Sequence, residues 1–304
     1  MRPRAQQWSN NMSVYAVERV RQVMDCLVAE KISPIVAAGS LPEQALRCFG
    51  DVTSQDAFQK ELIFLALRQI IGDVAAHNLA GDINVASWQA AIKQTEEALA
   101  KKAIPALNTP LTPDNTALTG LYASVFTLSA ASFNDASPKE GDTMLDLGAR
   151  FGETAVWALS RGVKQVYAFE ADPAAFACLS KNAETFGGKK ITPEQALPAD
   201  KEGTLRFGEG KKHADVPAVK IDVWCEKNKV QPNFIRVNLA GAAPALVGAQ
   251  EIIKTCKPRM AVNLSGNLAD MWNIPLLLKQ LAPEYRMACR KNAPDGDFML
   301  YAAV

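Results

Sequence analysis

The stretch "MLDLGARFGETAVWAL", Met144 to Leu159, decides the fold of this chain. Its apolar beginning, Met144 to Leu147, predicts a strand, and Gly148 and Gly152 predict a turn before a helix that starts near Glu153. Glycines permit unusual backbone angles and the close approach of a ligand, and the first helical turn offers unpaired N–H groups beside them. The stretch therefore predicts a ligand-binding turn within an α/β fold.

The segment that follows this stretch in the sequence completes a strand–helix–strand unit. Gly162 predicts the end of the helix, and "QVYAFE", Gln165 to Glu170, predicts a second strand that ends in an acid. An acid at this tip is placed to bind the two hydroxyls of a ribose. The glycine spacing is GxxxG rather than the GxGxxG of nicotinamide-binding proteins, so it favours the nucleoside S-adenosylmethionine. A related fold that binds no nucleoside is the alternative.

The chain from about Thr116 onward alternates short apolar runs with helical segments, which predicts a mostly parallel sheet covered by helices on both faces. The last two strands are separated by the turn sequence "NAPDGD" and should form an antiparallel hairpin. Strands are predicted at Met144–Leu147, Gln165–Phe169, around Ile191, and at Phe234–Leu239, Arg259–Leu264, Tyr285–Cys289 and Phe298–Ala302. Helices are predicted at Ala117–Phe133, Glu153–Arg161, Pro173–Phe186, Pro244–Cys256 and Met271–Leu281.

The first hundred residues predict helices only. Apolar residues recur at helical spacing from Val17 to Val28, "SLPE" at Ser40–Glu43 has the pattern of a capping box, and further helices are predicted at Ser54–Leu79 and Val85–Lys102. Three prolines between residues 105 and 113 predict a connection. We therefore predict a helical N-terminal domain with a proline-rich linker over residues 1–115, and an α/β domain over residues 116–304.

Composition narrows the classes of function. Hydrophobic residues make up 48% and charged residues 21% of the chain, as in ordinary globular proteins. A net charge of +1 argues against a nucleic-acid partner, and two histidines with six scattered cysteines predict no metal site. The N-terminus lacks an apolar stretch after its basic residues, and no segment is long and apolar enough to span a membrane, so we predict a cytoplasmic protein.

Several pieces of the chain from about Gly141 to Ala303 resemble the FkbM family of methyltransferases. They are "LDLGARFGETA", "VYAFEADPAAFACLSKNAE", "QALPADKEGTLRF", "KIDVWCEKN", "PNFIRVNLAGAAPALVGAQEIIKTCKPRMAVNL" and "FMLYAA", in the family's order. The resemblance implies a class I methyltransferase domain, Rossmann-like with a seven-stranded sheet, and S-adenosylmethionine as cofactor. It implies methyl transfer, most often to oxygen, on a hydroxyl of a small metabolite or a saccharide.

The resemblance also implies roles for individual residues. Asp146, Gly148, Ala149, Arg150 and Gly152 would form the cofactor loop. Glu170 would hold the ribose with Ala171 beside it, and Gln195 and Ala196 would border the adenine. Asn238, at the end of the fourth strand, would also contact the cofactor. Asp222 matches a family acid that we interpret as structural, in a turn or helix cap.

Two departures from the family pattern concern the chemistry. The family usually has "DxEGxE" where this chain reads "NLAGAA", so Asn238, Ala240 and Ala243 replace three acids. A neutral amide cannot serve as a base near neutral pH. Arg150 occupies a position at which family members usually have a small or polar residue. It is solvated, or bound to a carboxylate of cofactor or substrate, or it crowds the cofactor.

These departures leave two functions open. The first is an S-adenosylmethionine-dependent methyltransferase, and the second is an inactive relative that binds the nucleoside or serves as a scaffold or partner subunit. Because the strand ending at Asn238 delivers no carboxylate, we expect little transfer to simple alcohols and sugars. The sequence assigns no catalytic residue and no particular acceptor. The helical N-terminal region is a candidate surface for a homo-oligomer.

Overall fold

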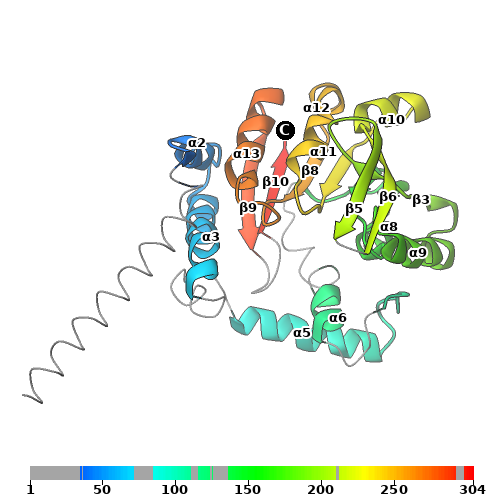
Figure 1. Cartoon of the computed structure of the whole chain (residues 1–304). Coiled ribbons are helices and arrows are strands. Elements are labelled where there is room, and N and C mark those ends of the chain that lie inside the picture. The colour runs from blue at the N-terminus through cyan, green and yellow to red at the C-terminus, as the bar shows by residue number, and fades with distance from the viewer. Residues whose placement is uncertain are drawn as a thin grey trace, which may run out of the picture.

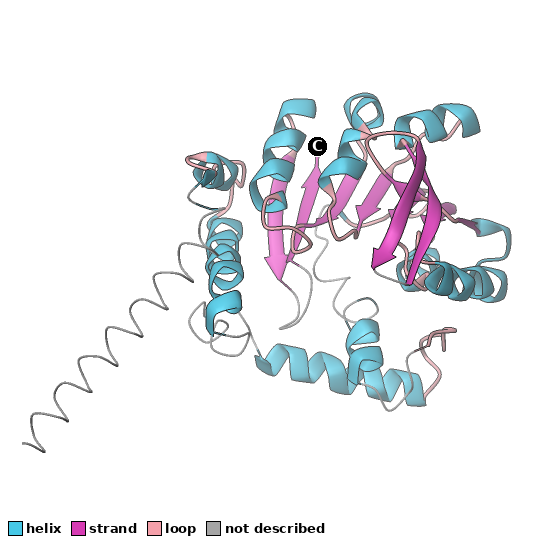
Figure 2. Ribbon diagram, in the orientation of Figure 1, coloured by secondary structure: helices cyan, strands magenta, loops and turns pink. Residues whose placement is uncertain are grey.

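The computed structural model describes residues 35, 37–71, 85–110, 116–123, 125, 136–209, 212–291 and 298–304. Its centre is a seven-stranded sheet in the order β3-β2-β1-β7-β8-β10-β9 (Figure 1, Figure 2). The five strands from β3 to β8 are parallel, and β10 is antiparallel to both of its neighbours. The strands are β1 Thr143–Leu147, β2 Gln165–Phe169, β3 Ile191–Glu194, β7 Phe234–Val237, β8 Arg259–Asn263, β9 Arg286–Lys291 and β10 Phe298–Ala303.

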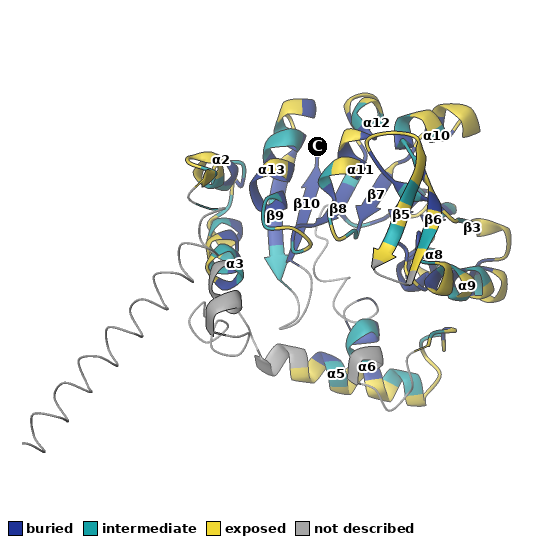
Figure 3. Ribbon diagram, viewed as in Figure 1, coloured by how far each residue is buried: buried dark blue, intermediate teal, exposed yellow. Residues whose placement is uncertain are grey.

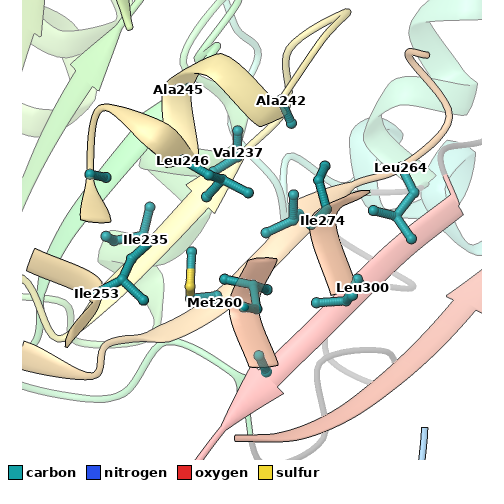
Figure 4. Close-up of a cluster of buried hydrophobic side chains, with 14 of the residues drawn as sticks. Ile235, Val237, Ala242, Ala245, Leu246, Ile253, Met260, Leu264, Ile274 and Leu300 are labelled. Atoms are coloured by element: carbon teal, nitrogen blue, oxygen red, sulfur yellow. The ribbon is translucent and has the colours of Figure 1, made fainter. Parts of the chain in front are cut away.

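Two apolar layers cover the sheet, because successive side chains of each strand point to opposite faces. On β1, Met144 packs in one layer while Leu145 and Leu147 pack in the other. The Met144 layer includes residues of α8 Glu153–Ser160 and α9 Pro173–Asn182. The opposite layer includes residues of α10 Ile221–Asn228, α11 Ala243–Val247, α12 Gln250–Cys256 and α13 Asp270–Leu281. Figure 4 shows part of this second layer, in which Ile235 and Met260 of the sheet lie beside Ile253 of α12.

The seven predicted strands are confirmed, and the last two form the predicted antiparallel pair, with Phe298 opposite Lys291. The predicted turn at residues 292–297 lies outside the described residues. One predicted helix is shorter than expected. The helix expected to reach residue 186 ends at Asn182 and continues as a π-helical turn, Ala183–Gly187, followed by a short 3₁₀ turn, Gly188–Lys190.

The prediction of one continuous helix at residues 244–256 is wrong, because the structure has two helices there, α11 and α12, with a break between them. Gly248 lies at the break, and a Cβ built there would come within 2.0 Å of the Ala199 carbonyl oxygen. The Gly248 carbonyl also accepts a hydrogen bond from the Asp222 N–H, at 2.8 Å. The chain therefore leaves the helix to pack its backbone against a neighbouring segment.

A second, three-stranded sheet was not predicted. It consists of β4 Leu197–Pro198, β5 Gly203–Glu209 and β6 Lys212–Val219, in the order β4-β6-β5. Much of the β5–β6 hairpin is exposed (Figure 3), so its sequence lacks the continuous apolar runs of the central strands. Helix α10, which follows it, was also not predicted as a helix.

The described part of the N-terminal region is helical, as predicted: α2 Leu41–Leu46, α3 Val52–Ile71, α5 Val85–Ala100 and α6 Thr116–Tyr122. The helical pattern near residues 17–28 lies outside the described residues, as do parts of the helices predicted to reach residues 79 and 133. The predicted capping box is wrong, because the Ser40 side chain makes no cap bond and instead accepts a hydrogen bond from Gln44 Nε2 at 2.9 Å. Pro42 does lie in the first turn of α2.

Helices α2 and α3 lie along the β9 edge of the sheet (Figure 1). Phe49 forms a bridge with Met287, and Lys291 Nζ of β9 is 2.7 Å from Glu61 Oε2 of α3, with both side chains buried. These contacts join the N-terminal helices to the sheet. The domain boundary near residue 115 stays a prediction. No helix in the described part of the chain is both long enough and apolar enough to cross a membrane.

Candidate functional site

The glycine loop joins β1 to α8 at the carboxyl edge of the parallel strands. The N–H groups of Gly148 and Ala149 donate to the Phe169 carbonyl at 3.0 and 2.9 Å, which ties the loop to the end of β2. Gly148 has φ +87°, and a Cβ built on it would lie 2.2 Å from the Asn238 carbonyl oxygen. Gly152, with φ +83°, is the N-cap of α8. The positive φ angles therefore favour glycine at both positions. At Gly148, the close approach to the end of β7 leaves no room for a side chain.

Glu170, at the tip of β2, fixes the glycine loop through a hydrogen bond to its backbone. Its Oε2 accepts the N–H of Arg150 at 2.7 Å, and its Oε1 accepts the N–H of Asp172 at 2.8 Å. The residue is 9% exposed, and burial raises the pKa of its carboxyl above the usual range, against the lowering effect of these two N–H groups. A carboxylate offers about four lone-pair positions, so two are left for further donors such as ribose hydroxyls.

Arg150 has a left-handed backbone, with φ +54°. This conformation is uncommon outside glycine, asparagine and aspartate, and it accounts for the small or polar residues that the family pattern has there. The side chain is exposed, and its guanidinium carbon lies 4.8 Å from the centre of the Phe151 ring. Within the described part of the chain, the guanidinium forms no ion pair.

Asp146 lies beneath the loop, fully buried, and forms an ion pair with Arg236 of β7 at 2.9 Å. Its second oxygen, Oδ2, has no hydrogen-bond partner among the described residues. Burial raises the pKa of the Asp146 carboxyl, and the Arg236 guanidinium opposes that shift. Sequence reasoning missed Arg236. The signal was a charged residue inside the apolar run "FIRVNL", because a buried charge needs a partner.

Glu153 is a second buried carboxylate in this cluster, and it was also missed. It is 2% exposed, and its Oε2 accepts the N–H of Phe151 at 3.2 Å. Burial raises the pKa of Glu153 to about 7, with Arg236 and Arg150 lowering it and Asp146 raising it. The cluster thus holds two buried carboxylates with the buried Arg236 near both, and the exposed Arg150 adds a further positive charge at the loop.

The segment before the α/β domain also reaches this loop. Asn182 of α9 is fully buried; its Oδ1 accepts the N–H of Asn108, and its Nδ2 donates to the carbonyls of Asn108 and Phe151. Tyr122 of α6 accepts the N–H of Leu107 at 2.7 Å. Asn182 thus ties the proline-rich connection to the glycine loop, a role that the sequence did not predict.

The end of β7 is held by neutral side chains. Asn238 Oδ1 accepts a hydrogen bond from Asn263 Nδ2 at 2.8 Å, and Asn263 Oδ1 accepts the N–H of Ser265. The Ser265 hydroxyl accepts the N–H of Phe298 at 2.6 Å. This network joins the ends of β7 and β8 to the beginning of β10.

An acid does lie near this strand end, but it comes from another element. Asp270, at the start of α13, is 2% exposed, and its Oδ2 accepts the N–H of Ala242 at 2.8 Å. Burial raises the pKa of the Asp270 carboxyl, and the backbone N–H groups of Ala242 and Ala243 oppose the shift. Gly266 packs beside Ala240, and a Cβ on Gly266 would lie 2.8 Å from the Ala240 Cα. The carboxylate of Asp270 therefore fastens the loop after β7.

The remaining predicted residues lie at the ends of β2 and β3. Ala171 and Ala196 are buried and Gln195 is exposed. The Glu194 carbonyl accepts the N–H groups of Glu170 and Ala196, which places the two strand ends together. The proposed cofactor contacts of these residues stay predictions. Asp222 accepts the N–H groups of Glu251 and Ile252 at 3.1 and 2.9 Å, so its interpretation as a helix cap is confirmed.

One surface cavity is separate from this cluster. This cavity, of about 540 Å³, lies between α10 and α12, lined by Cys225, Glu226 and Cys256 among others, and it includes none of the loop residues. Within the described ranges, no group of three histidine, cysteine or acidic side chains could hold a metal ion.

Comparison with known proteins supports the fold. A family model described as "Conserved hypothetical protein 95" matches residues 125–221. No curated protein matches the chain. The FkbM methyltransferase from Methylobacillus flagellatus KT has a similar structure, with a TM-score of 0.56 and 18% identity, over 89% of this chain and 60% of the other. This chain thus spans three fifths of that protein's length.

Two further solved structures are similar over part of the chain. The precorrin-6y C5,15-methyltransferase from Geobacter metallireducens GS-15 has a TM-score of 0.39 and 11% identity, over 58% of this chain and 87% of its own. Fibrillarin from Aeropyrum pernix, solved with S-adenosyl-L-methionine, has a TM-score of 0.38 and 16% identity, over 55% of this chain and 69% of its own.

The fold is that of the class I methyltransferases, as the sequence predicted. The similarity to the FkbM methyltransferase covers more of the chain than the family pattern found in the sequence, which began at about Gly141. Part of the helical N-terminal region therefore has a structural counterpart in that protein.

Proposed function

We propose that this chain is an S-adenosylmethionine-dependent methyltransferase of the FkbM type, which transfers a methyl group to an oxygen of a small metabolite or saccharide. The observation that carries the proposal is the arrangement of Glu170. Its carboxylate stands at the tip of β2, fixed by the glycine loop on one oxygen and by the following turn on the other. That is where a nucleoside ribose binds in an open α/β sheet.

The residues present also fit the other end of the cofactor. S-adenosylmethionine, when bound, supplies an electrophilic methyl group on a positively charged sulfur. Asp146 Oδ2 is buried and has no hydrogen-bond partner among the described residues. An ammonium group is a suitable donor for that oxygen, so we assign Asp146 to the methionine portion and Glu170 to the ribose. Arg236 keeps Asp146 oriented through its ion pair.

Positioning of the acceptor accounts for most of what such an enzyme must do, because methyl transfer requires the attacking oxygen in line with the methyl group. The neutral network of Asn238 and Asn263 can orient an acceptor by hydrogen bonds. The replacement of three acids by Asn238, Ala240 and Ala243 favours the inactive alternative, whereas the hydrogen bonds that fix Glu170 against the glycine loop favour this proposal.

Isothermal calorimetry with S-adenosylhomocysteine tests the proposal. We expect binding by the wild-type chain and a loss of about ten- to a hundredfold in Glu170→Ala, because a charged hydrogen-bond partner contributes about 1.5–3 kcal/mol. Glu202→Ala, at an exposed turn before β5, is the matched control and should bind normally. Thermal unfolding of each variant separates lost binding from lost folding.

The absence of heat and of any thermal shift at millimolar S-adenosylmethionine and S-adenosylhomocysteine would contradict the proposal. Binding without transfer to any acceptor would instead favour the inactive alternative.

A further inference from the structure

Arg150 lies at the edge of the proposed cofactor loop and forms no ion pair with a described residue, although its charge lowers the pKa of the buried Glu153. Its backbone is fixed, because its N–H donates to Glu170 Oε2 at 2.7 Å. Its side chain is exposed, and its guanidinium rests by the Phe151 ring without an ion pair to any described residue. Arg236 nearby is different, because it is buried and pairs with Asp146. Arg150 is therefore available to an anionic ligand, and a guanidinium binds a carboxylate with two parallel hydrogen bonds.

The carboxylates around the loop are buried, and each has at least one partner within the protein. Asp146, Glu153, Glu170 and Asp270 are each 9% exposed or less. Glu170 accepts two backbone N–H groups, Glu153 accepts one, Asp270 accepts that of Ala242, and Asp146 pairs with Arg236.

Two more acids lie at the strand ends. Asp172 caps α9 by accepting the N–H of Ala175 at 2.7 Å. Glu194 lies at the end of β3, two strands away from β1 in the sheet order. Asn238 and Ala240 at the end of β7 have no carboxylate. Asp172 and Glu194 are both half-buried and lie at the ends of β2 and β3, so the described part of the site has no fully exposed carboxylate or histidine beside the loop.

This arrangement bears on the acceptor, because the possible oxygen nucleophiles differ in their need for a base. A neutral hydroxyl must lose a proton when it is methylated, so it needs a proton acceptor at the site. A carboxylic acid is already ionised at neutral pH, since ordinary carboxyl groups have pKa values near 4. A carboxylate therefore needs orientation and a counter-charge, both of which Arg150 can provide.

We propose that the acceptor is a carboxylate held by Arg150, and that the product is a methyl ester. This inference rests on the proposed function and specifies its substrate class. The carboxylate oxygen forms the new bond to the methyl carbon, the carbon–sulfur bond breaks, and its electron pair stays on sulfur. The products are the methyl ester and S-adenosylhomocysteine, and no proton is released.

Binding to the product complex is the first test. Acetate, benzoate, succinate and citrate, each at millimolar concentration, are titrated calorimetrically into protein saturated with S-adenosylhomocysteine. We expect at least one to bind, and Arg150→Gln to weaken it by about tenfold or more, because the charge-assisted pair is lost. The matched control is Arg161→Gln, an equal charge change at an exposed residue at the other end of α8, which should leave binding unchanged.

The cofactor itself carries a carboxylate, so the experiment must separate the two sources. S-adenosylhomocysteine contains that carboxylate, whereas 5′-methylthioadenosine lacks it. If Arg150 binds the acceptor, Arg150→Gln should leave the affinity for both nucleosides within about twofold of wild type. A tenfold loss for S-adenosylhomocysteine with no change for 5′-methylthioadenosine would assign Arg150 to the cofactor and overturn the proposal.

Product chemistry is the second test. With methyl-labelled S-adenosylmethionine, the four acids and benzyl alcohol are compared as acceptors. In the reactions with the four acids, we expect a labelled product from which mild alkali releases the label as methanol. In weakly buffered solution, these reactions should release no proton. Alkali-stable product from the alcohol, with one proton released per turnover, would overturn the proposal and leave the methyltransferase function standing. Normal S-adenosylhomocysteine binding without carboxylate binding or ester formation would also overturn it, whereas no S-adenosylhomocysteine binding would overturn both.

Discussion

Replacement of Gly148 by alanine tests how closely the glycine loop approaches the end of β7. A Cβ on this residue would lie 2.2 Å from the Asn238 carbonyl oxygen and 2.9 Å from Leu239 Cδ2. The leucine side chain can rotate away, but the carbonyl belongs to a residue whose own N–H is bound to the Leu147 carbonyl at 2.8 Å. The loop and the strand end must therefore separate to admit the methyl group.

Two costs add in Gly148→Ala. The left-handed backbone, with φ +87°, costs an alanine about 1–2 kcal/mol, and overpacking of a fixed neighbour costs about 1–3 kcal/mol more. Gly141→Ala is the matched control, because Gly141 has φ +84° and nothing lies within 4 Å of the position of its Cβ. The control carries the backbone cost alone, so the difference between the variants isolates the contact with Asn238.

Urea unfolding followed by tryptophan fluorescence and by circular dichroism measures both variants against wild type. We expect a free energy of unfolding lower by about 2–5 kcal/mol in Gly148→Ala and by about 1–2 kcal/mol in Gly141→Ala. In a chain of this length, a change of 1 kcal/mol corresponds to roughly 2 °C in Tm. Equal losses in the two variants would refute the close approach of Gly148 to Asn238.

Three further variants test other parts of the structure. Asn238→Asp should fold normally, because Asn263 Nδ2 can still donate a hydrogen bond to the new side chain, as it does to Asn238 at 2.8 Å. Calorimetry should show an affinity for S-adenosylmethionine that is raised by about tenfold. An unchanged or lower affinity would argue against a cationic ligand at this position. Between pH 4.5 and about 7, the unfolded wild-type chain releases the Glu153 proton while the folded protein still holds it, so the wild type loses stability as the pH rises. Glu153→Gln removes this loss, and its Tm should therefore rise relative to that of the wild type over the same range. Tm profiles of the two proteins that stay parallel from about pH 4 to 8 would contradict the raised pKa. Lys291→Met should cost about 3–5 kcal/mol, because it removes the buried ammonium group that pairs with the Glu61 carboxylate. Glu61→Gln in the same chain should recover much of that stability in urea unfolding. If the single variant is neutral, α3 is not docked on β9 through this pair.

Periodic patterns predicted the central sheet because most of its strands are apolar runs with their own local signal. Met144 to Leu147 alternate between the two faces of a covered sheet, so both faces must be apolar, and the glycine turn follows directly. The β5–β6 hairpin escaped prediction because much of it is exposed and its strands lack that continuous apolar character. The break at Gly248 escaped it because its cause is the backbone of Ala199, which is distant in sequence.

The sequence by itself determined which residues could bind a nucleoside, since Glu170 and the glycine loop lie at fixed separations within one strand–helix–strand unit. Only the tertiary structure decided which charges face one another. Asp146 and Arg236 lie 2.9 Å apart on neighbouring strands, and Asn182 ties a segment of the N-terminal region to the loop. The parallel pairing of β1 with β7 sets the first contact, the packing of α9 against the connection sets the second, and burial raises the pKa of the Asp146 carboxyl. Local spacing in the sequence encodes neither contact.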